Sequence, residues 1–166
     1  MKELWILRHA HAEPYRDEAT DFERRLDSRG QAEAAAIGRL CAALHLDFEY
    51  IVASPAARTL ATARAVASGI GAGKPQFLEN PAIYLADRRA LAAIIRALPT
   101  GCSRALIVGH NPGISRLAHW ATSDERIGEL RPATLVGTRA DLGQWADAGE
   151  GLFERLRILR PEDASL

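Results

Sequence analysis

Three short polar clusters in the sequence combine residue types that bind anions or attack phosphorus. They are Arg8-His9-Ala10-His11, the pair Ser54 and Arg58, and Gly109-His110-Asn111. Arginine forks match phosphate oxygens bidentately, and a buried histidine among such groups can act as a nucleophile. If the fold brings the clusters together, Arg8, His9, Arg58 and His110 predict a site for a phosphoryl group.

A metal site is the first alternative, because His9 and His11 form an H-x-H pair whose side chains share one face of an extended segment. The carboxylate ligand expected near such a pair is missing, and Arg8 and Arg58 would repel a cation. We therefore expect no metal and no cofactor, and we expect His11 to lie at the rim of the site.

A purely structural role is the second alternative, since a single histidine at the end of a strand is usually a satisfied polar residue. Both His9 and His110 follow a predicted strand, and arginines accompany them. This pairing favours a functional role for the two histidines over a structural one.

The elements that must position these clusters are short apolar strands, because each cluster directly follows one. The three strands are predicted at residues 4–7, 50–53 and 105–108. The carboxyl ends of parallel strands share one edge of a sheet, and the crevice above that edge is the usual ligand site. The three clusters can therefore converge although about 100 residues separate the first from the last.

Helical patterns alternate with these strands. They cover residues 29–46, a helix capped by Ser54 with Pro55 at its first position, residues 88–98, and a helix capped by Asn111 with Pro112 at its start. Two later strands are predicted near residues 134–138 and 156–159. The alternation predicts one α/β domain over residues 1–166, a three-layer α/β/α sandwich with a largely parallel central sheet and no large lid subdomain.

Composition and charge exclude several other classes of protein. The 21 basic and 21 acidic side chains balance, so no global field favours nucleic acid or an anionic membrane as a partner. Two cysteines, Cys41 and Cys102, are too few for a disulfide framework and lack metal-ligand spacing. No apolar run is long enough for a signal peptide or a membrane span, and we expect a cytoplasmic protein.

The clusters also resemble a known family. Arg8-His9-Ala10, Ser54-Pro55-x-x-Arg58 and Gly109-His110-Asn111-Pro112 occur in the order found in the histidine phosphatase superfamily, which is phosphoglycerate mutase-like. The sequence most resembles the short SixA-like phosphohistidine phosphatases. Residues 24–34, RRLDSRGQAEA, are similar to the R-P-L-T-x-x-G-x-x-x-A segment of that group.

The resemblance implies a role for each matching residue. His9 would be the nucleophile that takes the phosphoryl group, flanked by Arg8. Arg58 and His110 would bind phosphate oxygens and stabilise the transition state, and Arg24 would be a further phosphate-binding arginine.

The chain departs from the family pattern at three positions, and at the first of them Ala10 replaces the common glycine. Arg25 stands where proline is usual, and Asp27 stands where threonine or serine is usual. We expect Asp27 to cap the following helix, because an acidic side chain would disfavour phosphate. Glu79 is the first acidic residue between Arg58 and His110 and is the candidate general acid, although cleaving a P–N bond expels imidazole and has less need of one.

We therefore expect a metal-independent phosphatase with a phosphohistidine enzyme intermediate, acting on histidine-phosphorylated protein. The alternative substrates are small phosphate esters and phosphoserine or phosphothreonine. A mutase is disfavoured because it needs a covering lid, and a non-catalytic phosphate-binding module is a further alternative. No nucleic acid or membrane partner is expected.

Overall fold

Strands and helices alternate along the chain in the computed structural model, which describes residues 1–71 and 73–165. The strands are β1 (Lys2–Arg8), β2 (Tyr50–Ala53), β3 (Gln76–Glu79), β4 (Arg104–Gly109), β5 (Leu135–Ala140) and β6 (Glu154–Leu159). The helices are α1 (Ser28–Ala43), α2 (Ala57–Ile70), α3 (Arg88–Arg96) and α4 (Gly113–Thr122). Short 3₁₀ helices include η1 (Asp21–Glu23) and η2 (Pro81–Ile83). None of the helices in the described ranges is long and apolar enough to cross a membrane.

The six strands form one sheet in the order β3-β2-β4-β1-β5-β6. The pairs β3–β2, β2–β4 and β4–β1 are parallel, whereas β1–β5 and β5–β6 are antiparallel. The sheet is therefore largely parallel, as the sequence predicts, and its two later strands form an antiparallel edge.

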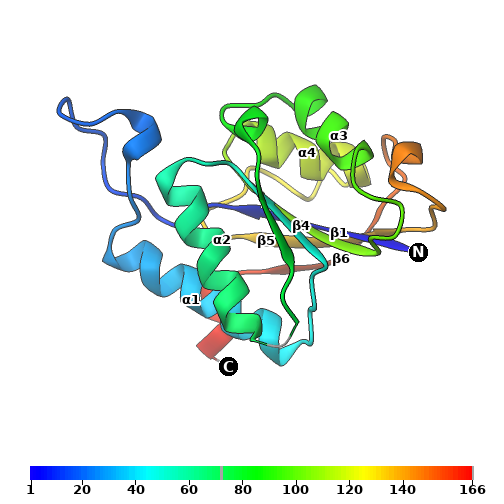
Figure 1. Ribbon diagram of the computed structural model, residues 1–166, viewed down its shortest axis with the longest axis horizontal. Helices are drawn as coiled ribbons and strands as arrows, with labels where there is room; N and C mark the ends of the chain where they lie inside the picture. Colours follow the sequence, from blue (N-terminus) through cyan, green and yellow to red (C-terminus); the bar gives the residue numbers. More distant parts are fainter. Residues whose placement is uncertain (72, 166) are drawn as a thin grey trace.

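Successive side chains of a strand point to opposite faces, and β1 accordingly supplies two cores. Leu4 and Ile6 pack with α3 and α4 in one core, while Trp5 and Leu7 pack with α1 and α2 in the other. Figure 1 shows the two helix pairs on opposite sides of the sheet. The predicted α/β/α sandwich is confirmed.

The register of the parallel strands brings the three polar clusters together. Arg8 at the end of β1 is paired with Gly109 at the end of β4, and Ala53 of β2 is paired with Val108. The chain then continues from these strand ends into His9, Ser54 and His110. The predicted convergence at one edge of the sheet is therefore present in the structure.

The two helices predicted to start at a proline begin two residues and one residue later than predicted. Helix α2 begins at Ala57 rather than at Pro55, and the Ser54 hydroxyl accepts a hydrogen bond from the Ala56 N–H in the preceding turn. Helix α4 begins at Gly113, and the Asn111 side chain bonds to Ser115 and Leu130 instead of capping the helix. Side-chain bonds within the connecting turns replace the predicted caps.

Asp27 and Gly30 determine how the N-terminus of α1 is capped and packed. Asp27 caps the helix as predicted, because its carboxylate accepts a hydrogen bond from the Gly30 N–H. Gly30 packs against the backbone that follows the first cluster, and a Cβ at this position would overlap the main-chain oxygen of His11. The glycine therefore lets α1 approach the segment that carries His9.

We predict that Gly30→Ala destabilises the fold, because the added methyl group forces the His11 backbone away from α1. The expected loss is about 1–3 kcal/mol of unfolding free energy, as for other overpacked positions, measured by urea denaturation. Gly101→Ala is the matched control, since a Cβ there meets no neighbouring atom, and it should change stability by less than about 0.5 kcal/mol. Equal stabilities of the two variants would contradict the packing account.

Candidate active site

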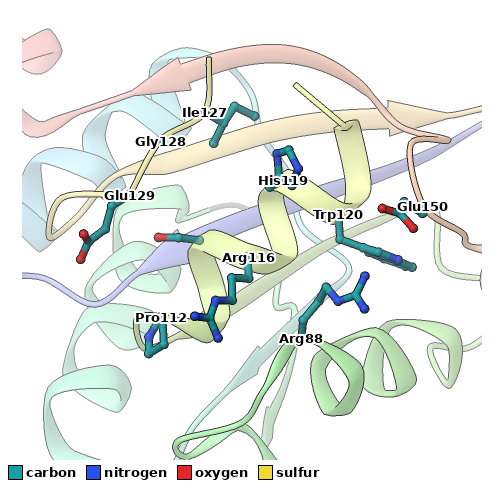
Figure 2. A pocket seen from close by; sticks show the side chains of 10 residues that line it. Arg88, Pro112, Arg116, His119, Trp120, Ile127, Gly128, Glu129 and Glu150 are labelled. Atoms are coloured by element: carbon teal, nitrogen blue, oxygen red, sulfur yellow. The ribbon is translucent and has the colours of Figure 1, made fainter. Parts of the chain in front are cut away.

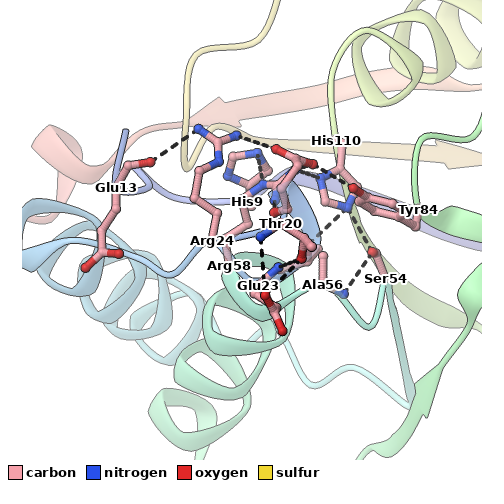
Figure 3. Close-up of polar contacts among 12 residues, drawn as sticks. His9, Glu13, Thr20, Glu23, Arg24, Ser54, Ala56, Arg58, Tyr84 and His110 are labelled. Atoms are coloured by element: carbon pink, nitrogen blue, oxygen red, sulfur yellow. Dashed lines mark hydrogen bonds and ion pairs between the residues drawn. The ribbon is translucent and has the colours of Figure 1, made fainter. Parts of the chain in front are cut away.

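A cavity of about 610 Å³ lies at the carboxyl edge of the parallel strands. All five residues predicted to act on phosphate line it, namely Arg8, His9, Arg24, Arg58 and His110. Figure 3 shows His9, Arg58, His110 and Tyr84 gathered at this edge. Among the residues that line the cavity, Asp21 is the one with an acidic side chain.

His9 is oriented with one ring nitrogen on the main chain and the other toward Arg58. Nδ1 lies 2.8 Å from the Ala10 carbonyl oxygen, which can only accept, so Nδ1 carries the proton. Nε2 accepts from the Arg58 Nε–H at 3.3 Å and therefore holds a lone pair. Burial lowers the pKa of His9 to about 4, and the charges of Arg58 and Arg8 act in the same direction. The ring is thus a neutral nucleophile at physiological pH.

Arg58 stands in the first turn of α2 and is only 3% exposed. Its guanidinium contacts both catalytic candidates, donating from Nε to His9 Nε2 and from Nη2 to His110 Nδ1 at 3.1 Å. The remaining donors bond to Asp21, from Nη1 to the main-chain oxygen at 2.6 Å and from Nη2 to the carboxylate at 3.0 Å. One buried cation therefore links the two histidines with a carboxylate.

His110 follows β4 and is held on its other side by two hydroxyl groups. Its Nε2 lies 2.8 Å from Ser54 Oγ and 3.1 Å from Thr59 Oγ1. Burial lowers the pKa of His110 to about 3, with further lowering by Arg58 and His9. The ring is therefore neutral, and a bound phosphate dianion would favour its protonation.

Arg8 and Arg24 each have one buried guanidinium nitrogen without a hydrogen-bond partner among the described residues. Arg8 Nη1 donates to the Leu130 carbonyl at 2.7 Å, and Arg24 Nη1 donates to the Glu13 carbonyl at 3.3 Å. The Nε atoms of both arginines are buried and have no hydrogen-bond partner among the described residues. Because the guanidinium groups of Arg8 and Arg24 line the cavity and are not fully paired by protein acceptors, the cavity is chemically suited to an anion.

Asp21 and Tyr84 are the site residues that sequence reasoning missed. The Asp21 carboxylate bonds to Arg58, lies 3.1 Å from Arg24 Nη2, and accepts from the Tyr84 hydroxyl at 2.7 Å. A local signal for η1 exists, because Thr20 and Glu23 form a capping box around Asp21. No comparable sequence signal marks Tyr84, whose ring packs edge-on against His110 at 5.4 Å.

The structure does not bring Glu79, the candidate general acid, into the cavity. Its side chain is half-exposed, and its carboxylate lies 3.6 Å from Arg64 Nη2 on the surface of α2. The reason is that β3, which sequence reasoning did not predict, carries Glu79 on the edge of the sheet. This placement does not support a role for Glu79 as proton donor.

His11 lies at the rim of the cavity, and its ring pairs with Asp27 at 2.5 Å. Arg25 does not line the cavity. Over residues 1–71 and 73–165, no three His, Cys, Asp or Glu side chains are grouped so that they could hold a metal ion.

A second cavity of about 430 Å³ runs along α4 and shares no lining residue with the first. Figure 2 shows Trp120, His119 and Arg116 of α4 on its wall, with Arg88 and Glu129 at its sides. It is lined by none of the residues of the three polar clusters, and Pro112 on its wall only follows Asn111 in the chain. We therefore assign the chemistry to the first cavity.

Comparisons with known proteins agree with this fold. Residues 4–80 match the family model described as histidine phosphatase superfamily (branch 1). An uncharacterized protein from Picosynechococcus sp. is 29% identical over 147 residues, which cover 88% of this chain and 72% of that protein.

Solved structures of SixA proteins share the fold over nearly the whole chain. SixA from Agrobacterium tumefaciens has a TM-score of 0.83 and 22% identity, covering 96% of this chain and 99% of its own. The protein histidine phosphatase SixA complexed with tungstate has a TM-score of 0.82 and 18% identity, covering 97% of this chain and 98% of its own.

The lowered pKa of His9 gives a testable titration. A histidine with an ordinary pKa of about 6.5 charges between about pH 7.5 and 5.5, whereas His9 should charge only as pH falls toward about 4. The ring resonances of His9, assigned with His9→Ala, should therefore stay constant between about pH 8 and 5.5 in an NMR titration of the free protein. A midpoint near 6.5 would contradict the buried, arginine-paired ring.

Proposed function

We propose that the chain hydrolyses phosphohistidine on proteins through a phosphoryl group carried by His9, because residues 4–80 match the model of the histidine phosphatase superfamily and the chain shares the fold of the SixA structures. The orientation of His9 carries this proposal. Its unprotonated Nε2 faces Arg58 inside a cavity that three arginines line. A neutral nucleophile beside fixed positive charges is suited to attack on phosphorus.

In the proposed first step, the lone pair of His9 Nε2 forms a P–N bond as the bond from phosphorus to the substrate nitrogen breaks. The electron pair of the broken bond leaves with the substrate imidazole. His9 Nδ1 keeps its proton and donates it in a hydrogen bond to the Ala10 carbonyl oxygen. This hydrogen bond stabilises the positive charge that develops on the phosphorylated ring. In the second step water attacks phosphorus and His9 leaves as neutral imidazole.

The remaining site residues would bind the oxygens of the transferred group. Arg58 and His110 would stabilise the charge of the in-line transition state, and the guanidinium groups of Arg8 and Arg24 would add hydrogen bonds. These groups would stabilise the negative charge of the transition state, as a metal ion does in other phosphatases. We therefore propose that the reaction needs no metal.

The surroundings of the cavity favour a macromolecular substrate over small phosphate esters. Leu85 lines the cavity yet is 66% exposed, and Phe22 is 39% exposed and packs on Tyr84 with ring centroids 5.1 Å apart. Apolar side chains at the mouth can rest against the surface of a carrier protein while its phosphoryl group reaches His9. A small ester would leave these contacts unused and gain little transition-state binding from them.

We predict a phosphorylated enzyme in which the label is on His9. Radiolabel from a small phosphoramidate should give acid-labile, alkali-stable label that is absent in His9→Ala and present in His45→Asn, a change at an exposed histidine. Labelling should be equal in the presence of a strong chelator. Label on a hydroxyl side chain, or labelling that needs a divalent ion, would contradict the proposed mechanism.

Arg58→Ala should lower turnover by about 10²-fold or more, the scale for one lost transition-state donor in a closed site. Arg64→Ala is the matched control, because Arg64 lies on the same helix and is exposed. It should retain turnover within about threefold, measured on the same phosphorylated substrate. A similar loss in both variants would point to damage to α2 rather than to a lost phosphate contact.

The substrate class is tested by comparing kcat/KM on different phosphorylated molecules. Efficiency on a histidine-phosphorylated protein should exceed that on sugar phosphates or phosphoglycerates by at least about 100-fold, or about 2.7 kcal/mol of transition-state binding. Leu85→Ser should lower efficiency on the protein more than on a small phosphoramidate, whereas Leu152→Ser, at another exposed leucine, should change neither. Equal or reversed efficiencies would favour the small-ester phosphatase.

A further inference from the structure

The carboxylate of Asp21 occupies the donors that the proposed function assigns to phosphate. One oxygen lies 3.1 Å from Arg24 Nη2, and the other lies 3.0 Å from Arg58 Nη2 and 2.7 Å from the Tyr84 hydroxyl. Asp21 also accepts from Arg58 Nη1 through its main-chain oxygen. The free site therefore holds an internal anion against its own arginines.

A substrate phosphoryl group that binds the Nη2 atoms of Arg58 and Arg24 must displace this carboxylate, because the carboxylate already contacts both of them. The displaced side chain remains at the mouth of the cavity, since η1 is held by its own capping box between Thr20 and Glu23. The Asp21 side chain is about one-third exposed, so it can swing without leaving a buried core. Asp21 thus remains beside the phosphoryl group after the phosphoryl group has replaced it as the partner of the arginines.

Hydrolysis of phospho-His9 is faster when a positioned group takes a proton from the attacking water. His9 is itself bonded to phosphorus, and the arginines have no acceptor atoms. Nδ1 of His110 accepts from Arg58, and the Glu79 carboxylate pairs with Arg64 outside the cavity. Of the described residues that line the cavity, only Asp21 offers a carboxylate.

The electrostatics of Asp21 change in the direction that a base requires. Burial opposes its ionisation, but hydrogen bonds from Tyr84 and Arg58 outweigh this effect and lower its pKa in the free site. The carboxylate is therefore ionised before substrate arrives. A phosphoryl group that takes over the arginines places negative charge nearby, which raises the pKa and makes the carboxylate a stronger proton acceptor.

We propose that Asp21 is the general base in the hydrolysis of phospho-His9, an inference that rests on the proposed function. The water oxygen forms a bond to phosphorus as the bond from phosphorus to His9 Nε2 breaks. The electron pair of that bond returns to Nε2, and Nδ1 keeps its proton. The water proton passes to the Asp21 carboxylate and from there to solvent.

The test separates the formation of phospho-His9 from its decay. Phosphoenzyme is made with a labelled small phosphoramidate, the donor is removed rapidly, and the remaining label is followed, with urea-denatured phosphoenzyme as the background. In Asp21→Asn the decay should slow by about 10²-fold or more, the usual contribution of a general base. Labelling of His9 should be as fast as in the wild type or faster, because the competing charge is gone.

Two further variants sharpen this result. Asp17→Asn removes an exposed acid from the same segment and should leave both rates unchanged. Asp21→Glu keeps a carboxylate and should decay faster than Asp21→Asn. Normal labelling of His9 in each variant also shows that the variant is folded.

The inference is overturned if Asp21→Asn decays at the wild-type rate, or if Asp21→Glu decays no faster than Asp21→Asn. Equal slowing of formation and decay would also overturn it, since that pattern means Asp21 only holds Arg58 in place. A wild-type protein that forms no phospho-His9 would refute the proposed function itself. The two failures are therefore distinguishable.

Discussion

The buried guanidinium of Arg58 is the interaction on which the rest of the site depends. A charge that is 3% exposed must be paired, because an unpaired buried charge destabilises a protein by several kcal/mol. Its N–H groups bond to His9, His110 and Asp21, which fixes both rings and brings η1 over the cavity. Together with burial, its charge lowers the pKa of both histidines, so both rings are neutral at physiological pH.

Much of this arrangement could be predicted from the sequence, because it depends on backbone geometry. Short apolar segments that alternate with helices predict a parallel sheet, and parallel strands end at one edge. The pairing of Arg8 with Gly109 then places His9 next to His110 without any detail of side-chain packing. Arg58 follows because it lies one turn into the helix that continues from β2.

The missed features depend on contacts that no local pattern encodes. Asp21 reaches Arg58 across 37 residues and Tyr84 across 63, through loops whose paths are set by the finished fold. The cap predicted at Ser54 failed because tertiary contacts give this side chain another partner, His110. Glu79 was expected near the phosphate from its order in the chain, yet the edge strand β3 directs its carboxylate to Arg64.

The central claim is that the phosphoryl group is carried by His9, and the steric course at phosphorus tests it most directly. A phosphorothioate substrate made chiral by oxygen isotopes can be hydrolysed in isotopically labelled water, and NMR of the product then gives its configuration. Each in-line displacement inverts phosphorus, so attack by His9 followed by attack by water predicts net retention. Net inversion would show that water attacks the substrate directly and would contradict the covalent mechanism.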